Sequence, residues 1–145
     1  PKGDGFHSNT EQLRARAADP AIEGRVRFTG FVPEDMLPAL YSDAFAVAMP
    51  AFSEGFGLPA AEAIACGTPV IATGHGAVAE VVGSAGMFFD PQDPSDIARV
   101  IAHLGQDQLL AAQLQAACLP RSAQLSWKRS ANEMVGLLER YAGCS

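Results

Sequence analysis

Two glutamates and two glycines lie close together in one segment, and residues of these types at this spacing could bind an anion and a diol. Glu54 and Glu62 are separated by seven residues, and Gly55 and Gly57 lie between them. Glycine lets a backbone come close to a ligand, and the unpartnered N–H groups at a helix start favour an anion. A carboxylate accepts hydrogen bonds through two oxygens, which suits the paired hydroxyls of a ribose or a hexose.

The distribution of charge bears on how an anion would be held. The stretch from Phe28 to Ala98 contains no Lys or Arg and nine acidic residues. A diphosphate bound in this segment would therefore depend on the amides of Phe56, Gly57 and Leu58, on the helix end, and on cations brought from elsewhere. A P-loop is excluded, because the sequence has no G-x-x-x-x-G-K-[ST].

Each of these residues also has a purely structural explanation. Glycines in a turn between a strand and a helix often serve only the turn. Glu62 would also favour the dipole of a helix that begins near Leu58, and Glu54 would also be stable as a solvated surface side chain. From the residues alone both explanations stay open.

The segments around the loop alternate between strands and helices. The apolar runs 44–50 and 68–73 are typical of strands buried on both faces. Between them, the segment 53–67 predicts a loop, then a helix with Pro59 in its first turn, then a stop at Gly67. Further strands are predicted at 25–31 and 86–90, and further helices at 8–19, 33–43, 74–83, 93–105, 106–119 and 126–143.

This alternation predicts an α/β fold: a doubly wound, Rossmann-like parallel sheet with helices on both faces. Ligands of such sheets bind beyond the carboxyl ends of the strands. The loops after Phe31, Pro50 and Thr73 are therefore expected on the binding side.

Composition narrows the class of protein. The chain has 145 residues, is 48% hydrophobic and carries a formal charge of −6. It has the apolar content for a core, and its acidity argues against a nucleic-acid or anionic-membrane surface. Its longest apolar run, residues 44–52, is less than half of the ~20 residues that a membrane span needs. The three cysteines have no metal or disulfide spacing, so a reducing cytoplasm is expected.

The run PAFSEGFGLPAAEAIACGTPVIA (50–72) resembles the signature of the retaining glycosyltransferases of family 4, also called group 1, which have the GT-B fold. The flanking segments 26–33 and 79–98 resemble the same family. The resemblance implies that residues 1–145 are a nucleotide-sugar-binding, Rossmann-like part of the C-terminal half of that fold. On this reading the chain is N-terminally truncated, and its upstream strands and acceptor-binding domain lie outside these residues.

The resemblance also implies roles for individual residues. Glu54 would be catalytic, holding the donor sugar and stabilising charge near its anomeric carbon. The amides of residues 56–58 would bind the sugar and diphosphate, and Glu62 would bind the ribose diol. The backbone at Val32 would pair with the nucleobase edge. The family usually needs no metal, and no cofactor is expected besides the nucleotide-diphosphate sugar, which is the donor substrate.

The implied function is transfer of a sugar, of the hexosyltransferase type, to an acceptor sugar, lipid or small molecule that the missing N-terminal domain would bind. The isolated chain is expected to be inactive, and the full-length enzyme to be cytoplasmic, with peripheral membrane association compatible with its role. The alternatives are a non-catalytic nucleotide-sugar-binding or protein-binding domain and a GT-B-related nucleotide-sugar epimerase. An exposed sheet edge would allow self-association, and nucleic acid is not expected as a partner.

Overall fold

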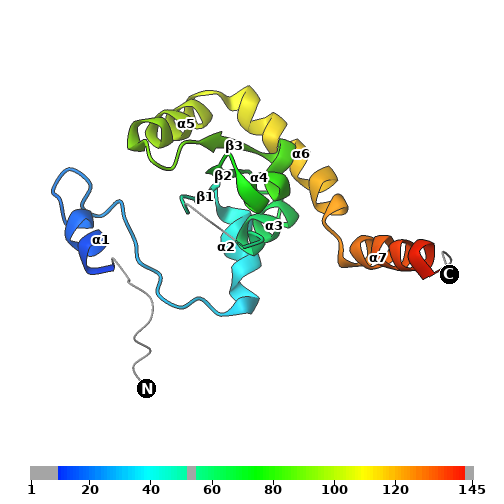
Figure 1. Ribbon diagram of the computed structural model, residues 1–145. Helices are drawn as coiled ribbons and strands as arrows, with labels where there is room; N and C mark the ends of the chain where they lie inside the picture. Colours follow the sequence, from blue (N-terminus) through cyan, green and yellow to red (C-terminus); the bar gives the residue numbers. More distant parts are fainter. Residues whose placement is uncertain (1–9, 52–54, 143–145) are drawn as a thin grey trace, which may run out of the picture. The chain divides into compact units, whose positions relative to one another are not determined.

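The described residues fall into two compact units. The structure is a computed structural model and describes residues 10–51 and 55–142 (Figure 1). The chain divides into residues 1–33 and residues 34–145. The first unit contains helix α1 (Thr10–Ala17), and the second contains the sheet and the remaining described helices.

In the first unit, the prediction of a strand at 25–31 is wrong: these residues form no strand in the part of the chain that the structure describes. A strand needs a neighbour that takes up its backbone hydrogen bonds, and α1 offers none. Gly30, at φ 66°, also breaks the extended conformation. One side-chain contact links the segment to α1: the Arg14 guanidinium lies 4.6 Å from the centroid of the Phe28 ring.

The second unit is built on a parallel sheet. Strands β1 (Val47–Met49), β2 (Val70–Thr73) and β3 (Gly86–Phe89) lie in that order, and both neighbouring pairs are parallel. Val70 is the partner of Val47 on one side and of Gly86 on the other. The predicted parallel arrangement is confirmed, and the carboxyl ends of all three strands meet at one edge of the sheet.

Helices cover both faces of this sheet. Along β2 successive side chains point to opposite faces: Val70 and Ala72 join a core with α3 and α4, and Ile71 joins a second core with α5 and the start of α6. Figure 1 shows α3 and α5 on opposite sides of the strands. The helices are α2 (Leu37–Asp43), α3 (Leu58–Ala65), α4 (Gly76–Val82), α5 (Pro94–Gln106), α6 (Gln108–Gln124) and α7 (Trp127–Ala142), with the 3-10 turns η1 (Glu34–Met36) and η2 (Gly83–Ala85).

Short polar side chains fix where the helices beyond the sheet begin. Asp93 accepts a hydrogen bond from the amide of Ser95 (2.9 Å) and caps α5, whose first residue is Pro94. Asp107 caps α6 in the same way through the amide of Leu110 (2.9 Å). The predicted helix at 93–105 is confirmed, and the helix predicted at 106–119 continues to Gln124.

Strand β1 differs from its prediction. All four residues of β2 are buried, as expected, but Ala48 in β1 is exposed and only Met49 is fully buried. The Phe45 side chain, just before β1, is 62% exposed. Within the described residues β1 is the outer strand of the sheet and has a neighbouring strand on one side only. Its apolar residues are therefore less buried than the prediction of a strand covered on both faces requires.

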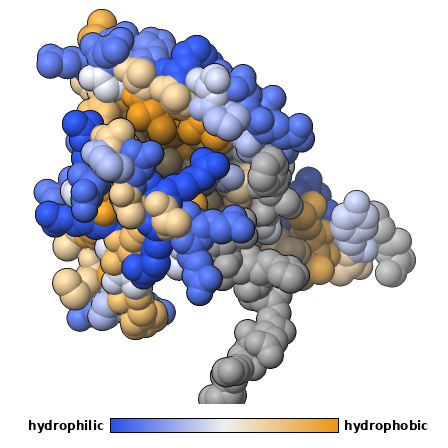
Figure 2. Space-filling view, turned by 90° about the vertical axis from the view of Figure 1, so that its left-hand side faces the viewer, coloured by the Kyte–Doolittle hydropathy of each residue, from blue (hydrophilic) through white to orange (hydrophobic). Residues whose placement is uncertain are grey.

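Large apolar side chains also remain exposed elsewhere. Helix α7 contains no buried residue, and its apolar side lies open to solvent. Figure 2 shows apolar residues, in orange, among hydrophilic ones on one face of the molecule. The exposed apolar residues of α7 are Trp127, Met134, Val135, Leu137, Leu138 and Tyr141.

Gly86 is the tightest backbone position in the sheet, and it gives a prediction for stability. A Cβ at this position would lie 1.9 Å from the carbonyl oxygen of Val70 on the neighbouring strand. We expect Gly86→Ala to destabilise the fold by about 1–3 kcal/mol, because the two strands must separate. Denaturant unfolding measures the change. Gly105→Ala in α5 is the control: a Cβ there meets nothing within 4 Å, so it should be neutral or stabilising, and equal losses in both variants would contradict the explanation.

Candidate functional site

The turn into α3 leaves backbone donors without partners. Gly57 precedes the helix in the left-handed conformation (φ 85°, ψ 43°), and its carbonyl accepts the amides of Ala60 (2.9 Å) and Ala61 (3.2 Å). Among the described residues, the N–H groups of Phe56, Gly57 and Leu58 have no recorded acceptor. The helix start therefore presents three free amides, the arrangement that binds an anion.

Glycine is required at position 57 for two reasons. Its positive φ strains any residue that has a Cβ. A Cβ there would also lie 3.2 Å from Cγ2 of Val78 in α4. The close contact packs the start of α3 against α4, and Gly57 itself is buried between its exposed neighbours Phe56 and Leu58.

The loop after β2 reaches the same edge of the sheet. Thr73, the last residue of β2, is 1% exposed, and its hydroxyl lies 3.0 Å from Nδ1 of His75. His75 precedes the first residue of α4 in an extended conformation. The loops after Pro50 and Thr73 thus both leave the carboxyl ends of the sheet, as predicted. The loop after Phe31 belongs to the other unit, and its place on the binding side stays a prediction.

Glu62 lies about one helical turn after Leu58 in α3, and its carboxylate is held from the neighbouring helix. The phenol of Tyr41 in α2 donates a hydrogen bond to Oε2 of Glu62 at 3.1 Å. Burial raises the pKa of the Tyr41 phenol above its ordinary value, and the bond to the Glu62 carboxylate raises it further. Glu62 and Tyr41 line a cleft of about 410 Å³ together with Glu34, Leu37, Pro38, Ala65 and Cys66.

Two of the arginines of the second unit are occupied elsewhere. Arg99 pairs with Asp96 in α5 at 2.5 Å. Arg121 in α6 donates through Nε to the carbonyl of Val81 at 2.9 Å and through Nη2 to the carbonyl of Glu80. Arg121 thus caps the end of α4. Neither guanidinium lines the cleft of Glu62.

The sequence-predicted site residues divide into three groups. Phe56, Gly57, Leu58 and Glu62 are brought together at the start of α3. Val32 lies in the first unit, and its role as the base-contacting residue stays a prediction. Glu54 lies outside the described residues. Tyr41 was missed, because nothing in the sequence links it to a glutamate 21 residues further along.

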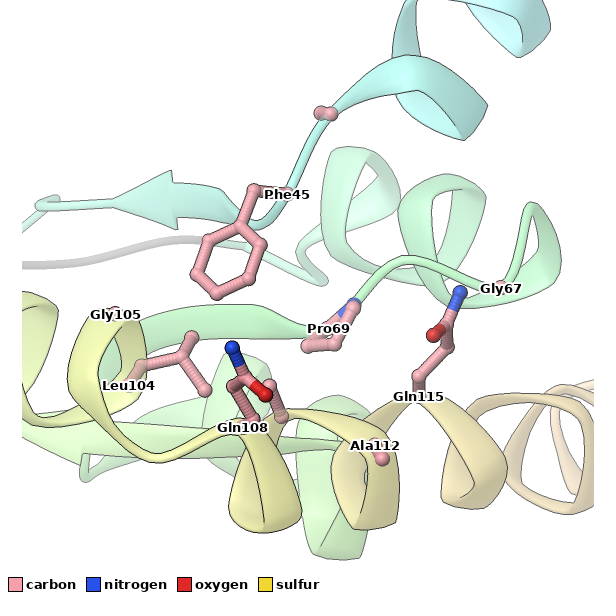
Figure 3. A pocket seen from close by; sticks show the side chains of 10 residues that line it. Phe45, Gly67, Pro69, Leu104, Gly105, Gln108, Ala112 and Gln115 are labelled. Atoms are coloured by element: carbon pink, nitrogen blue, oxygen red, sulfur yellow. The ribbon is translucent and has the colours of Figure 1, made fainter.

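A second hollow lies at the opposite end of the strands. It has a volume of about 370 Å³ and is lined by residues that precede β1 and β2 and by parts of α5 and α6. Figure 3 shows the Phe45 ring above Leu104 and Gln108, with the Gln115 amide further along α6 toward Gly67. None of the described residues that line it is charged. Its position at the amino ends of the strands separates it from the free amides and from Glu62.

Two further findings concern the described part of the chain. No three His, Cys, Asp or Glu side chains gather there in a way that could hold a metal ion. No helix in those residues combines the length and the apolar content that crossing a bilayer requires.

Comparison with known proteins gives consistent matches. Residues 3–107 match the family profile described as glycosyl transferases group 1. The O-antigen chain mannosyltransferase B of Escherichia coli is 38% identical over 113 residues, which are 78% of this chain and 30% of that protein. The chain thus spans about a third of the length of this curated relative.

Solved structures agree with this match. Sucrose-phosphate synthase from Thermosynechococcus elongatus superimposes with a TM-score of 0.79 at 30% identity, over 93% of this chain and 35% of that one. HepE from Anabaena, solved in complex with UDP and glucose, superimposes with a TM-score of 0.75 at 25% identity, over 90% of this chain and 36% of that one.

Proposed function

The chain belongs to the group 1 glycosyltransferases and forms part of a GT-B type of fold, and on this premise we propose that it is the donor-binding part of the enzyme. The enzyme transfers a sugar, as a hexosyltransferase, from a nucleoside-diphosphate sugar to an acceptor sugar, lipid or small molecule, with retention of the anomeric configuration. The acceptor binds outside residues 1–145, which form a partial Rossmann-like domain. The isolated chain is not expected to turn over.

One observation carries the proposal: three free amides lie at the start of α3, and the carboxylate of Glu62 lies about one turn further along the same helix. The amides of Phe56, Gly57 and Leu58 bind the diphosphate and the sugar. Arg99 and Arg121 are engaged with other groups, and the loop itself contributes backbone donors for the diphosphate. The complex of HepE with UDP and glucose supports a nucleotide sugar as the ligand class.

Glu62 binds the ribose diol. It lies about 6 Å along the helix axis from the start of α3, which is on the order of the distance between a ribose and the phosphates attached to it. Its carboxylate is solvent-exposed and faces a cleft. Val32 contacts the base through its backbone, and Glu54 stabilises the charge that develops at the anomeric carbon.

Three further properties belong to the same proposal. The leaving diphosphate needs no metal, because the helix end and basic side chains stabilise it. The enzyme works in the cytoplasm, with peripheral association with membranes where its acceptor is a lipid. The outer edge of β1 is the edge through which copies would pair.

The test compares two glycine variants in the intact enzyme. We expect Gly57→Ala to weaken nucleotide-sugar binding by about tenfold, because the substitution displaces amides that bind a charged group. It should also lower stability by about 1–2 kcal/mol through the left-handed backbone. Thermal shift with UDP-, GDP- and ADP-sugars identifies the donor, and calorimetric titration then measures its affinity.

Gly67→Ala is the matched control. Gly67 has nearly the same backbone (φ 82°) but lies at the other end of α3, and a Cβ there meets nothing within 4 Å. It should lose stability through the left-handed backbone alone, without the added contact that Gly57→Ala makes with Val78, and keep its affinity. Equal loss of affinity in both variants, or no shift of the unaltered enzyme by any of the three donors, would contradict the proposal.

A further inference from the structure

Glu62 is held by a hydrogen bond from another helix, and this bond suggests a role for a residue outside the family signature. We propose that Tyr41 is a positioning residue that orients the Glu62 carboxylate toward the ribose and thereby makes the site selective for ribonucleotides over deoxyribonucleotides. The inference rests on the proposed function of Glu62. It concerns the bond from the Tyr41 hydroxyl to Oε2 of Glu62, 3.1 Å long.

Tyr41 is itself firmly placed. The hydroxyl of Thr68, a residue that is 2% exposed, donates to the carbonyl of Tyr41 at 2.6 Å. The amide of Thr68 in turn donates to the carbonyl of Ala63 in α3 at 2.9 Å. Tyr41 also packs against the hydrophobic core that α3 and α4 share. The backbone of Tyr41 is thus tied to the helix that carries Glu62 through Thr68, and its side chain packs against the core beside that helix.

Glu62 needs such a partner. It is exposed and has three rotatable side-chain torsions, so without a partner its carboxylate would sample several directions. Among the described residues no Lys, Arg or His lines this cleft, and the donor that the structure shows for the carboxylate is the Tyr41 hydroxyl. A neutral phenol fixes the carboxylate without neutralising its charge, whereas a cation would compete with the ligand for it.

The stoichiometry of hydrogen bonds leaves room for a ribose. A carboxylate has about four lone-pair sites, and Tyr41 uses one of them on Oε2. Oε1 and the other site on Oε2 remain for the 2′ and 3′ hydroxyls. A deoxyribose would leave one of these oriented acceptors without its donor, which is the situation in which a polar site discriminates well between related ligands.

The binding test uses UDP, GDP and ADP with their 2′-deoxy counterparts, titrated into the intact enzyme. We expect Tyr41→Phe to weaken binding of the best ribonucleotide about three- to tenfold. Binding of the 2′-deoxy form of the same nucleotide should weaken less than twofold. Phenylalanine keeps the ring in the core and removes only the hydroxyl. Tyr141→Phe, at the exposed end of α7, is the control and should change neither affinity.

A second readout tests the contact without any ligand. In the intact enzyme, the difference between ultraviolet titrations recorded with and without Tyr41→Phe isolates the phenol of Tyr41. We expect Glu62→Gln to lower the pKa of Tyr41 obtained from this difference. In the binding assay, adding Tyr41→Phe to Glu62→Ala should cause no further loss, because the two residues act through one contact.

The outcomes separate the two levels of inference. If Glu62→Gln leaves the titration of Tyr41 unchanged, the contact is absent and the role of Tyr41 is overturned, while the role of Glu62 is unaffected. If the titration of Tyr41 changes but Tyr41→Phe weakens the binding of ribonucleotide and deoxyribonucleotide by the same factor, selectivity through Tyr41 is overturned. The same holds if Tyr41→Phe weakens the binding of neither nucleotide. If the unaltered enzyme binds none of the three ribonucleotides, the proposed function fails and the ribose role fails with it.

Discussion

Glu54→Gln is expected to slow sugar transfer by about 10²–10³-fold, because it removes a negative charge that stabilises the transition state. In a retaining transfer, positive charge develops at the anomeric carbon while the diphosphate leaves. Glutamine has nearly the same shape as glutamate and still accepts hydrogen bonds from the sugar hydroxyls. The affinity for the nucleotide should therefore change by less than about threefold, since base, ribose and diphosphate contact other groups.

The measurement pairs single-turnover rates at saturating donor with calorimetric titration of the nucleotide, both in the intact enzyme. Glu139→Gln, an exposed carboxylate on α7, is the control and should change neither quantity. If Glu54→Gln reduces the affinity and the rate by the same factor, Glu54 contributes ordinary binding and its catalytic role is lost.

The sheet could be predicted from the sequence because its signals are local. A short apolar run such as 68–73 has few alternatives to a buried strand, and all of β2 is buried. Asp93 followed by Pro94 places the start of α5 within one residue. In these places one segment contains all the information that its structure needs.

Segments that depend on a distant partner could not be predicted. The alternating residues 25–31 satisfy the pattern of a strand, but whether they form one depends on a neighbouring strand, and Gly30 at φ 66° interrupts them. The apolar sequence of β1 likewise says nothing about which neighbours cover it. Phe45 remains 62% exposed beside this strand.

The candidate site shows the same division. The turn at Gly57 and the carboxylate of Glu62 belong to one short segment, so their spacing along the helix follows from helix geometry. The bond from Tyr41 to Glu62 depends on how α2 packs against α3, and that packing is set in part by Thr68. No spacing rule connects these residues, so only the folded chain reveals them.

Glu62→Ala should weaken nucleotide binding by about 1.5–3 kcal/mol, or roughly 10- to 150-fold, because a hydrogen bond to a charged group is lost. Simple electrostatics predicts the opposite sign, since removing a carboxylate near a diphosphate reduces repulsion. A loss of affinity would therefore identify direct hydrogen bonds to the ribose. Calorimetric titration of UDP, GDP or ADP into the intact enzyme measures it.

Glu34→Ala separates the specific role of Glu62 from the general acidity of the cleft. Glu34 lines the same cleft but has no assigned contact with the ligand, so its removal should leave the affinity unchanged or slightly higher.

At saturating donor, Glu62→Ala should retain most of its transfer rate, because the ribose contact is made equally in the ground state and the transition state. An unchanged affinity in Glu62→Ala would remove this residue from the site, and with it the ribose role of Tyr41. If Glu62→Ala lowers only the affinity and Glu54→Gln lowers only the rate, the two glutamates of the signature have different roles: Glu62 in binding the nucleotide and Glu54 in the transfer reaction.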